Sequence, residues 1–264
     1  MSELLKRILV SVIFIPFLLL ALYYEGLLLY LMFLLVSILG TQEYLAMLKN
    51  VGYRIPVYWL VLTPLFYSVW VVFPAYEAAL LWPAILLIVI HALSTWDVES
   101  SVPEMFATLF GLLYTGLFPA MIVKIGWYHP EQKILLALIL MIWIVDTVAY
   151  FIGMRFGKKR GITQVSPQKS REGFIAGGLA PWLILLILYI SGFGAISRLS
   201  LVLIAIAAGI IGQLGDLLES MLKRFCNVKD SSRLIPGHGG VLDRTDSILL
   251  AGAFLFSALK IINM

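Results

Sequence analysis

The chain has 264 residues, of which 61% are hydrophobic and only 13% are charged. Its mean hydropathy is +0.99, and the charged share is about half of the roughly 25% that is typical of soluble domains. So little polar material cannot cover the surface of a water-soluble protein of this size. The composition therefore excludes a soluble enzyme, a disordered chain and a conventional nucleic-acid-binding protein. It predicts a protein that crosses a membrane several times.

Nine apolar segments follow one another along the chain, and most are close to the ~20 residues that a helix needs to cross the hydrocarbon. We predict an all-α polytopic membrane helical bundle with about nine transmembrane helices, because the strands of a barrel would be shorter and would alternate. Residues 1–100 would be packing helices that could form an interface, and residues 101–264 the catalytic transmembrane region, with no soluble domain. The segments lie at roughly 8–24, 27–48, 57–73, 75–94, 104–126, 132–154, 176–195, 199–222 and 241–262.

The distribution of cations predicts the topology. Two polar stretches, 155–175 and 223–240, interrupt the second half of the chain. If the N-terminus is cytoplasmic, nine spans place 15 of the 19 Lys and Arg residues on the cytoplasmic side, in accord with the positive-inside rule. The four outside would be Lys124, Lys133, Arg198 and Lys260. We therefore expect a multi-pass protein of the cell inner or plasma membrane, with both polar loops in the cytoplasm. A thiol reagent should reach the single cysteine, Cys226, only from that side.

Acidic residues within spans are energetically costly and are candidates for function. Asp146 lies in the sixth segment, roughly 12 Å from its cytoplasmic end at 1.5 Å per residue. Asp216 and Glu219 lie near the cytoplasmic end of the eighth segment, and Asp243 and Asp246 open the ninth. Three helices would then present carboxylates at a similar depth, where divalent cations would relieve their repulsion. The oxygen ligands and the lack of a His or Cys cluster favour Mg²⁺.

Simpler interpretations stay open for single residues. Asp146 alone could be an acid that is hydrogen-bonded inside the bundle. Glu43, near the inner end of the second segment, is predicted to be structural. Asp216, Glu219 and Lys223 share one helix face by their spacing of three and seven residues. The basic runs taken alone could be only topology signals.

The two polar loops have compositions that suit phosphate binding. The first, from Phe156 to Gly173, combines glycines, hydroxyls and cations, although Ser170 could simply cap the following helix. The second contains the turn Pro236-Gly237-His238-Gly239-Gly240, which would bring backbone close to a ligand at the start of the ninth helix. His238 could contact phosphate or only shape its own turn.

The stretch 220–246 resembles the signature of the phosphatidate cytidylyltransferase (CDP-diacylglycerol synthase) family at every fixed position. Further resemblance comes from Asp146–Tyr150, Phe156–Lys158, Ser166–Gly173 and Gly215–Ser220. The resemblance implies a nucleotidyltransferase of phospholipid biosynthesis that makes CDP-diacylglycerol and pyrophosphate from CTP and phosphatidic acid. It implies Mg²⁺ as cofactor, alone or with a second cation, and an active site that faces the cytoplasm. The other partners would be membrane lipids, with no nucleic acid.

On that resemblance we assign roles to individual residues. The predicted catalytic residues are Asp146, Asp216, Lys223, Asp243 and Asp246, and the metal ligands are Asp216, Asp243 and Asp246, with Asp146 as a further ligand or an orienting group. The predicted substrate-binding residues are Lys158, Ser166, Lys169, Ser170, Glu219, Ser220, Arg224, Lys229, His238, Gly239, Gly240 and Arg244.

Three alternatives remain open from the sequence. Small residues at Ala205, Ala208, Gly209 and Gly212 allow close helix packing, either within one subunit or in a homodimer. A cation-coupled transporter would also use acids inside the membrane, but it usually has internal repeats, and this sequence has none that we detect. A polyprenol or lipid kinase would share the loose pattern of acids and basic loops, and it would differ in releasing a nucleoside diphosphate.

Overall fold

The computed structural model describes residues 3–130, 132–158, 160–161 and 163–262. In these residues the chain forms nine helical rods and no β-sheet, which confirms the predicted all-α membrane bundle. The rods are α1 (Glu3–Tyr24), α2 (Gly26–Asn50), α3 (Trp59–Val72), η1 (Pro74–Tyr76) with α4 (Glu77–Ser94), α5 (Ser101–Gly111) with η2 (Leu112–Leu117) and α6 (Phe118–Tyr128), α7 (Ile134–Phe156), α8 (Arg171–Ile190), α9 (Arg198–Ile206) with η3 (Ala207–Gly212) and α10 (Gln213–Phe225), and α11 (Leu242–Ile262).

Seven of these rods are long and apolar enough to cross a membrane, and the apolar parts Phe14–Tyr24 and Trp59–Val72 are shorter. The helix α4 indicates what surrounds the helical rods. Its large apolar side chains Trp82, Leu86, Ile90 and Leu93 are all exposed. A helix that is apolar all round is stable on a surface only if that surface meets lipid. The composition of the rods therefore fits a bundle whose outside is the hydrocarbon.

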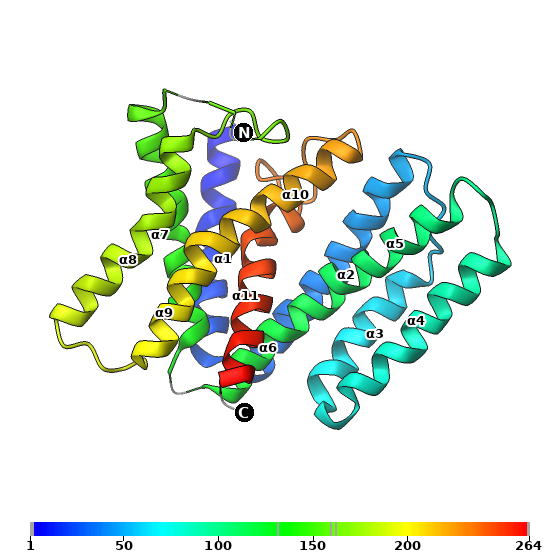
Figure 1. Ribbon diagram of the computed structural model, residues 1–264, viewed down its shortest axis with the longest axis horizontal. Helices are drawn as coiled ribbons and strands as arrows, with labels where there is room; N and C mark the ends of the chain where they lie inside the picture. The colour runs from blue at the N-terminus through cyan, green and yellow to red at the C-terminus, as the bar shows by residue number, and fades with distance from the viewer. Residues whose placement is uncertain (1–2, 131, 159, 162, 263–264) are drawn as a thin grey trace.

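The bundle is organised around α11 (Figure 1). This helix packs against α6, η3 and α10. The α7–α8 hairpin lies on one side of it and the α3–α4 hairpin on the other (Figure 1). The loops after α7 and after α10 lie at the same end as the start of α1, and the last turn of α11 lies at the opposite end. The two polar loops therefore share one end of the bundle, as the charge distribution predicted.

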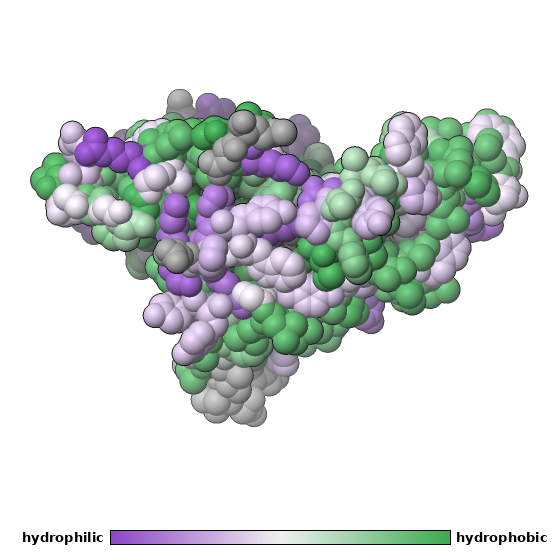
Figure 2. Space-filling model, turned by 90° about the horizontal axis from the view of Figure 1, so that it is seen from below, coloured by the Kyte–Doolittle hydropathy of each residue, from purple (hydrophilic) through white to green (hydrophobic). Residues whose placement is uncertain are grey.

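The opposite end holds the four cations that the topology placed outside. Figure 2 shows this end, where hydrophilic residues gather toward the middle and the arm built by α3 and α4 is largely hydrophobic. Glu77 forms ion pairs with the buried Lys124 and, at 2.9 Å, with Lys260. Much of the charge at this end is thus neutralised within the chain. Of the cations assigned to the other side, Lys159 and the side chains of Lys6 and Arg7 lie outside the described part.

Two of the rods contain a π-helical turn, Leu112–Leu117 and Ala207–Gly212. Such turns widen a helix locally and often occur at functional sites. Gly209 in the second turn packs against α8, where an added Cβ would lie 3.0 Å from the carbonyl oxygen of Gly178. Gly209, one of the small residues predicted for close packing, therefore serves a helix contact within this chain.

Candidate active site

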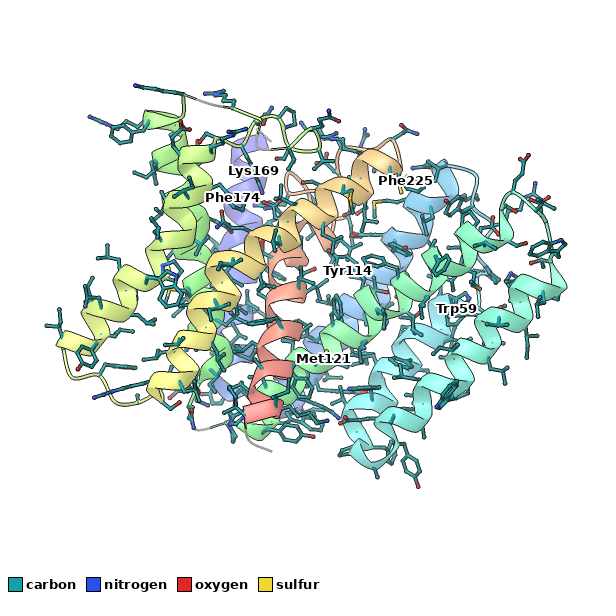
Figure 3. The ribbon with its side chains drawn as sticks, in the orientation of Figure 1. Trp59, Tyr114, Met121, Lys169, Phe174 and Phe225 are labelled. Carbon is teal, nitrogen blue, oxygen red and sulfur yellow. The ribbon has the colours of Figure 1, made fainter. Side chains whose placement is uncertain are left out.

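A cavity of about 780 Å³ lies between α7, α8 and α10, next to the loop that precedes α8. Asp146 of α7 is exposed to it, and Asp216 of α10 lines the other side. Lys169 lies in the first loop, at the end of the bundle that carries the two polar loops (Figure 3), and it forms an ion pair with Asp216. The predicted residues Asp146, Lys169 and Asp216 are therefore brought together at one cavity.

The walls of this cavity differ in polarity. Tyr150 and Met154 of α7 and Phe174 of α8 contribute apolar surface, whereas Arg160 and Gln168 come from the polar loop. Tyr150 and Met154 are also exposed and belong to the membrane-spanning helix α7. A cavity with a charged end and an apolar wall suits an amphiphile with an anionic head group.

The first loop is fixed where it meets α8. The Ser170 hydroxyl accepts a hydrogen bond from the Gly173 backbone N–H at 3.1 Å and thus caps α8, as one of the two sequence interpretations had it. Gly153, Gly157 and Gly173 let the α7 and α8 backbones approach, since a Cβ on any of them would press on Ser170. The role of Ser170 in substrate binding stays a prediction. The same holds for Ser166, which is half-buried in the loop, and for the exposed Lys158.

Asp243 organises the second loop from the first turn of α11. Its Oδ2 accepts hydrogen bonds from the Ser231 N–H (2.8 Å), the Ser231 hydroxyl (2.9 Å) and the Gly240 N–H (2.8 Å). Its Oδ1 accepts one from Lys223 Nζ at 2.6 Å, and Lys223 also donates to Glu219 Oε2 at 2.9 Å. The chain itself therefore engages both oxygens of Asp243. Its role as a metal ligand stays a prediction, and the structure adds a role in holding the loop.

The predicted face of α10 divides in two. Glu219 and Lys223 interact as expected from their spacing of four residues, but Asp216 turns to the cavity and pairs with Lys169 instead. Glu219 is fully buried and lies against Asp246, and its Oε1 has no hydrogen-bond donor in the described part of the chain. Two carboxyl groups so close repel each other unless a proton or a cation lies between them.

A metal fits this arrangement only in part. The carboxylate oxygens of Glu219 and Asp246 are hard ligands of the kind that Mg²⁺ prefers. One of them, Glu219 Oε1, accepts no hydrogen bond from the described residues. Within the described ranges, however, no three His, Cys, Asp or Glu side chains form a ready-made metal site. The predicted set of Asp216, Asp243, Asp246 and Asp146 stays a prediction.

The remaining predicted residues surround the two loops. Arg244 Nε donates to the His238 carbonyl oxygen at 2.9 Å, and Arg224 Nε lies 3.4 Å from the Val165 carbonyl oxygen of the first loop. Gly239 has a φ of 86°, which requires glycine. Lys229 is exposed, and Ser220 is half-buried on α10. The two loops thus meet at Arg224, and their cations line the same end of the bundle.

Two residues near the site were not predicted to act in it. Glu43 of α2 binds the second loop, and Tyr114 of η2 is fully buried with a hydroxyl that has no partner among the described residues. Figure 3 places Tyr114 in the interior below α10. A carboxylate in a span was the available signal for Glu43, whereas nothing in the local sequence distinguished Tyr114 from the other aromatic residues.

Comparisons with known proteins agree with the resemblance. The model of the cytidylyltransferase family matches residues 5–262. The phosphatidate cytidylyltransferase of Bacillus subtilis is 43% identical over 124 residues, 47% of this chain and 46% of the relative. That of Haemophilus influenzae is 45% identical over 126 residues, covering 46% and 43%. That of Rickettsia bellii is 31% identical over 199 residues, covering 70% and 85%. The chain thus matches slightly less than half the length of the first two relatives.

Proposed function

The chain belongs to the cytidylyltransferase family, and on this premise we propose that it transfers the cytidylyl group of CTP to phosphatidic acid. The products would be CDP-diacylglycerol and pyrophosphate. The observation that carries the proposal is the cavity at which Lys169 and Asp216 meet, because it joins a charged end to an apolar wall. The relatives named phosphatidate cytidylyltransferase support the same reaction.

The reaction asks for little acid–base chemistry. An oxygen of the lipid phosphate forms a bond to the α-phosphorus of CTP. The bond from that phosphorus to the oxygen bridging to the β-phosphate breaks, and pyrophosphate leaves with the electron pair. The lipid phosphate is already anionic at neutral pH. Positioning and charge neutralisation should therefore supply most of the acceleration.

The residues of the two loops suit that task. Lys169 would leave its ion pair with Asp216 to bind a phosphate of either substrate. Arg160 of the first loop lines the same cavity, and Arg224 bridges to the second loop. Their positive charges would hold two phosphate-bearing molecules together against their mutual repulsion.

The place of the cavity suggests how the lipid enters. Phosphatidate would keep its acyl chains along the apolar side of Tyr150 and Phe174 and bring its phosphate to Lys169. CTP would arrive from the end of the bundle that carries the two loops. The excess of cations at that end supports a cytoplasmic active site in a cell membrane. A homodimer is compatible with this entry route.

Mg²⁺ would bind through the carboxylates of Asp216 and Asp246, with Asp146 and Asp243 beside them. When bound, the ion would neutralise developing charge on the leaving pyrophosphate. Glu219 Oε1, which lacks a donor, is the observation that favours a cation here. Lys223 neutralises Glu219 and Asp243 from the other side and keeps the buried acids from repelling one another.

An assay of the purified protein tests the proposal. Pyrophosphate should appear only when CTP, phosphatidate and Mg²⁺ are all present, with each omitted in turn as a control. A lipid or polyprenol kinase would instead release a nucleoside diphosphate and no pyrophosphate. Lack of any turnover by a folded protein with all three components would contradict the proposal and favour a transporter.

A further inference from the structure

Glu43 lies on α2, outside the segment that carries the family signature, yet it holds that segment in place. It is 4% exposed, and both of its carboxylate oxygens are saturated by the second loop. Oε1 accepts hydrogen bonds from the Ser232 hydroxyl (2.7 Å) and the Val241 N–H (2.8 Å). Oε2 accepts them from the Ser231 hydroxyl and the Leu242 N–H, both at 2.9 Å. One side chain therefore binds the middle of the loop and the first turn of α11 at once.

These contacts extend to the predicted catalytic residues. The Ser231 hydroxyl has one proton, which it shares between Glu43 Oε2 and Asp243 Oδ2, each 2.9 Å away. Asp243 in turn accepts a hydrogen bond from Lys223, which also binds Glu219. A continuous chain of short polar contacts thus runs from α2 through the loop to α11 and α10.

We propose that Glu43 is a positioning residue that sets the geometry of Asp243 and Lys223 by fixing the loop between them. The consequence for the reaction rests on the proposed cytidylyl transfer, whereas the fixing of the loop does not. Glu43 has no oxygen left for a ligand, so it acts through Ser231 and Asp243. Residues that orient a site in this way typically affect activity about 10–100-fold when replaced.

The chemistry requires a carboxylate at this position. Val241 and Leu242 open α11, where backbone N–H groups lack partners within the helix and favour a negative charge. A glutamine has the same shape, but its NH₂ group would face two of the four donors. Gly240 leaves just enough room, since a Cβ there would collide with the Ser231 hydroxyl and the Glu43 carboxylate. Shape and charge are therefore both matched to this one side chain.

The experiment compares Glu43→Gln with Glu104→Gln in the full-length protein. Glu104 is a matched control because it also accepts a hydrogen bond from a backbone N–H, that of Arg54 at 2.8 Å, in a loop outside the site. The first readout is hydrogen exchange of residues 229–241. The second is the rate at which a thiol reagent modifies Cys226, which is 1% exposed at the end of α10. We expect both rates to rise by about tenfold or more in Glu43→Gln, because its local opening becomes easier, and to stay at the wild-type value in Glu104→Gln.

The kinetics separate positioning from general stability. Glu43→Gln should lower kcat for pyrophosphate release by about 10–100-fold while the KM for phosphatidate stays unchanged, because the cavity of Lys169 and Phe174 is intact. Ser232→Ala removes only one of the four donors and should fold normally, so it carries the test if Glu43→Gln does not fold. Its kcat should fall about tenfold, as for one lost hydrogen bond to a charged group.

The proposal would be overturned if Glu43→Gln, or Ser232→Ala in its place, had the wild-type rate of hydrogen exchange, the wild-type rate of Cys226 modification and the wild-type kcat. A drop in thermal stability with wild-type kcat would overturn it as well, since that is the behaviour of a packing residue. If the wild-type protein releases no pyrophosphate, the proposed function fails. The exchange and thiol readouts then still decide whether Glu43 fixes the loop.

Discussion

Lys169 and Asp216 form an ion pair that joins the first loop to α10 across the cavity. The two side chains are 30% and 32% exposed. A partly exposed pair of this kind contributes little to stability, typically about 0–1 kcal/mol. The pair therefore matters for what it holds near the cavity, which is a cation that an incoming phosphate can take over and a carboxylate that is then free to bind a metal ion.

Lys169→Ala should accordingly separate activity from stability. We expect the free energy of unfolding to fall by less than about 1 kcal/mol. Pyrophosphate release should fall by about 100-fold, as when one transition-state donor is lost. Arg171→Ala is the control, because Arg171 is an exposed cation on the neighbouring turn of α8. Equal losses in the two variants would reduce Lys169 to a general contribution of positive charge.

Asp246→Asn should abolish turnover and leave the protein folded in detergent. The side chain lies against the buried Glu219, so removal of one negative charge relieves repulsion instead of creating it. Thermal unfolding and pyrophosphate release measured on the same preparation check both parts. Asp97→Asn, in the exposed loop between α4 and α5, is the matched control and should have wild-type activity. Near-normal turnover by Asp246→Asn would remove Asp246 from the proposed metal site.

Lys223→Ala should lower both the free energy of unfolding and the rate of pyrophosphate release. Lys223 Nζ contacts Glu219 and Asp243, and its loss leaves two buried carboxylates without their cation, which typically costs about 3–5 kcal/mol. The double variant Lys223→Ala with Glu219→Gln should regain much of the stability, because one of the unpaired charges is gone. It should not regain pyrophosphate release. Unchanged kinetics in Lys223→Ala would mean that Lys223 is only a topology charge.

The sequence predicted the nine helices well because a membrane span is encoded locally by its length and apolar composition. The boundaries fail where a helix begins with polar residues. The seventh rod is the example, since it was predicted at 176–195 but is α8, Arg171–Ile190. Its first turn contains Arg171 and Glu172, and the cap at Ser170 marks the true start. A hydropathy pattern does not detect that turn, whereas the capping pattern does.

The site was predictable only as far as contacts are local. The pairing of Glu219 with Lys223 follows from their spacing on α10, but the partner of Asp216 comes from the first loop. Glu43 was predicted to be structural from its place near the end of its span, and its hydrogen-bond donors lie 188 to 199 residues further along the chain. No periodicity links such distant residues. The sequence therefore predicted that these acids lie near one another, but it did not predict which partner each of them binds.

The topology needs a different reporter from the one that the sequence suggested. Cys226 was expected to react only from the cytoplasmic side, and that side stays a prediction; because Cys226 is buried at the end of α10, a reagent has little access to it in the folded protein. In a Cys226→Ser background we place Arg233→Cys, in the exposed second loop, against Gly194→Cys, which has open space between α8 and α9. An impermeant thiol reagent added outside intact cells should label only Gly194→Cys. The reverse pattern would invert the topology.

Glu25 makes stability depend on pH at the end of the bundle opposite the loops. It lies between α1 and α2, 3% exposed, and burial raises its pKa from 4.5 to about 7, a rise that Lys133 partly opposes. An acid with a raised pKa favours the folded state only while it is protonated, so its contribution is lost as the pH rises from about 4.5 to 7. Glu25→Gln should therefore raise the free energy of unfolding at pH 8, by up to about 3 kcal/mol, and should change it little at pH 4. Glu99→Gln, an exposed acid, is the control. A stability difference between wild type and Glu25→Gln that is the same at both pH values would contradict the prediction, because it would show that Glu25 does not titrate between them.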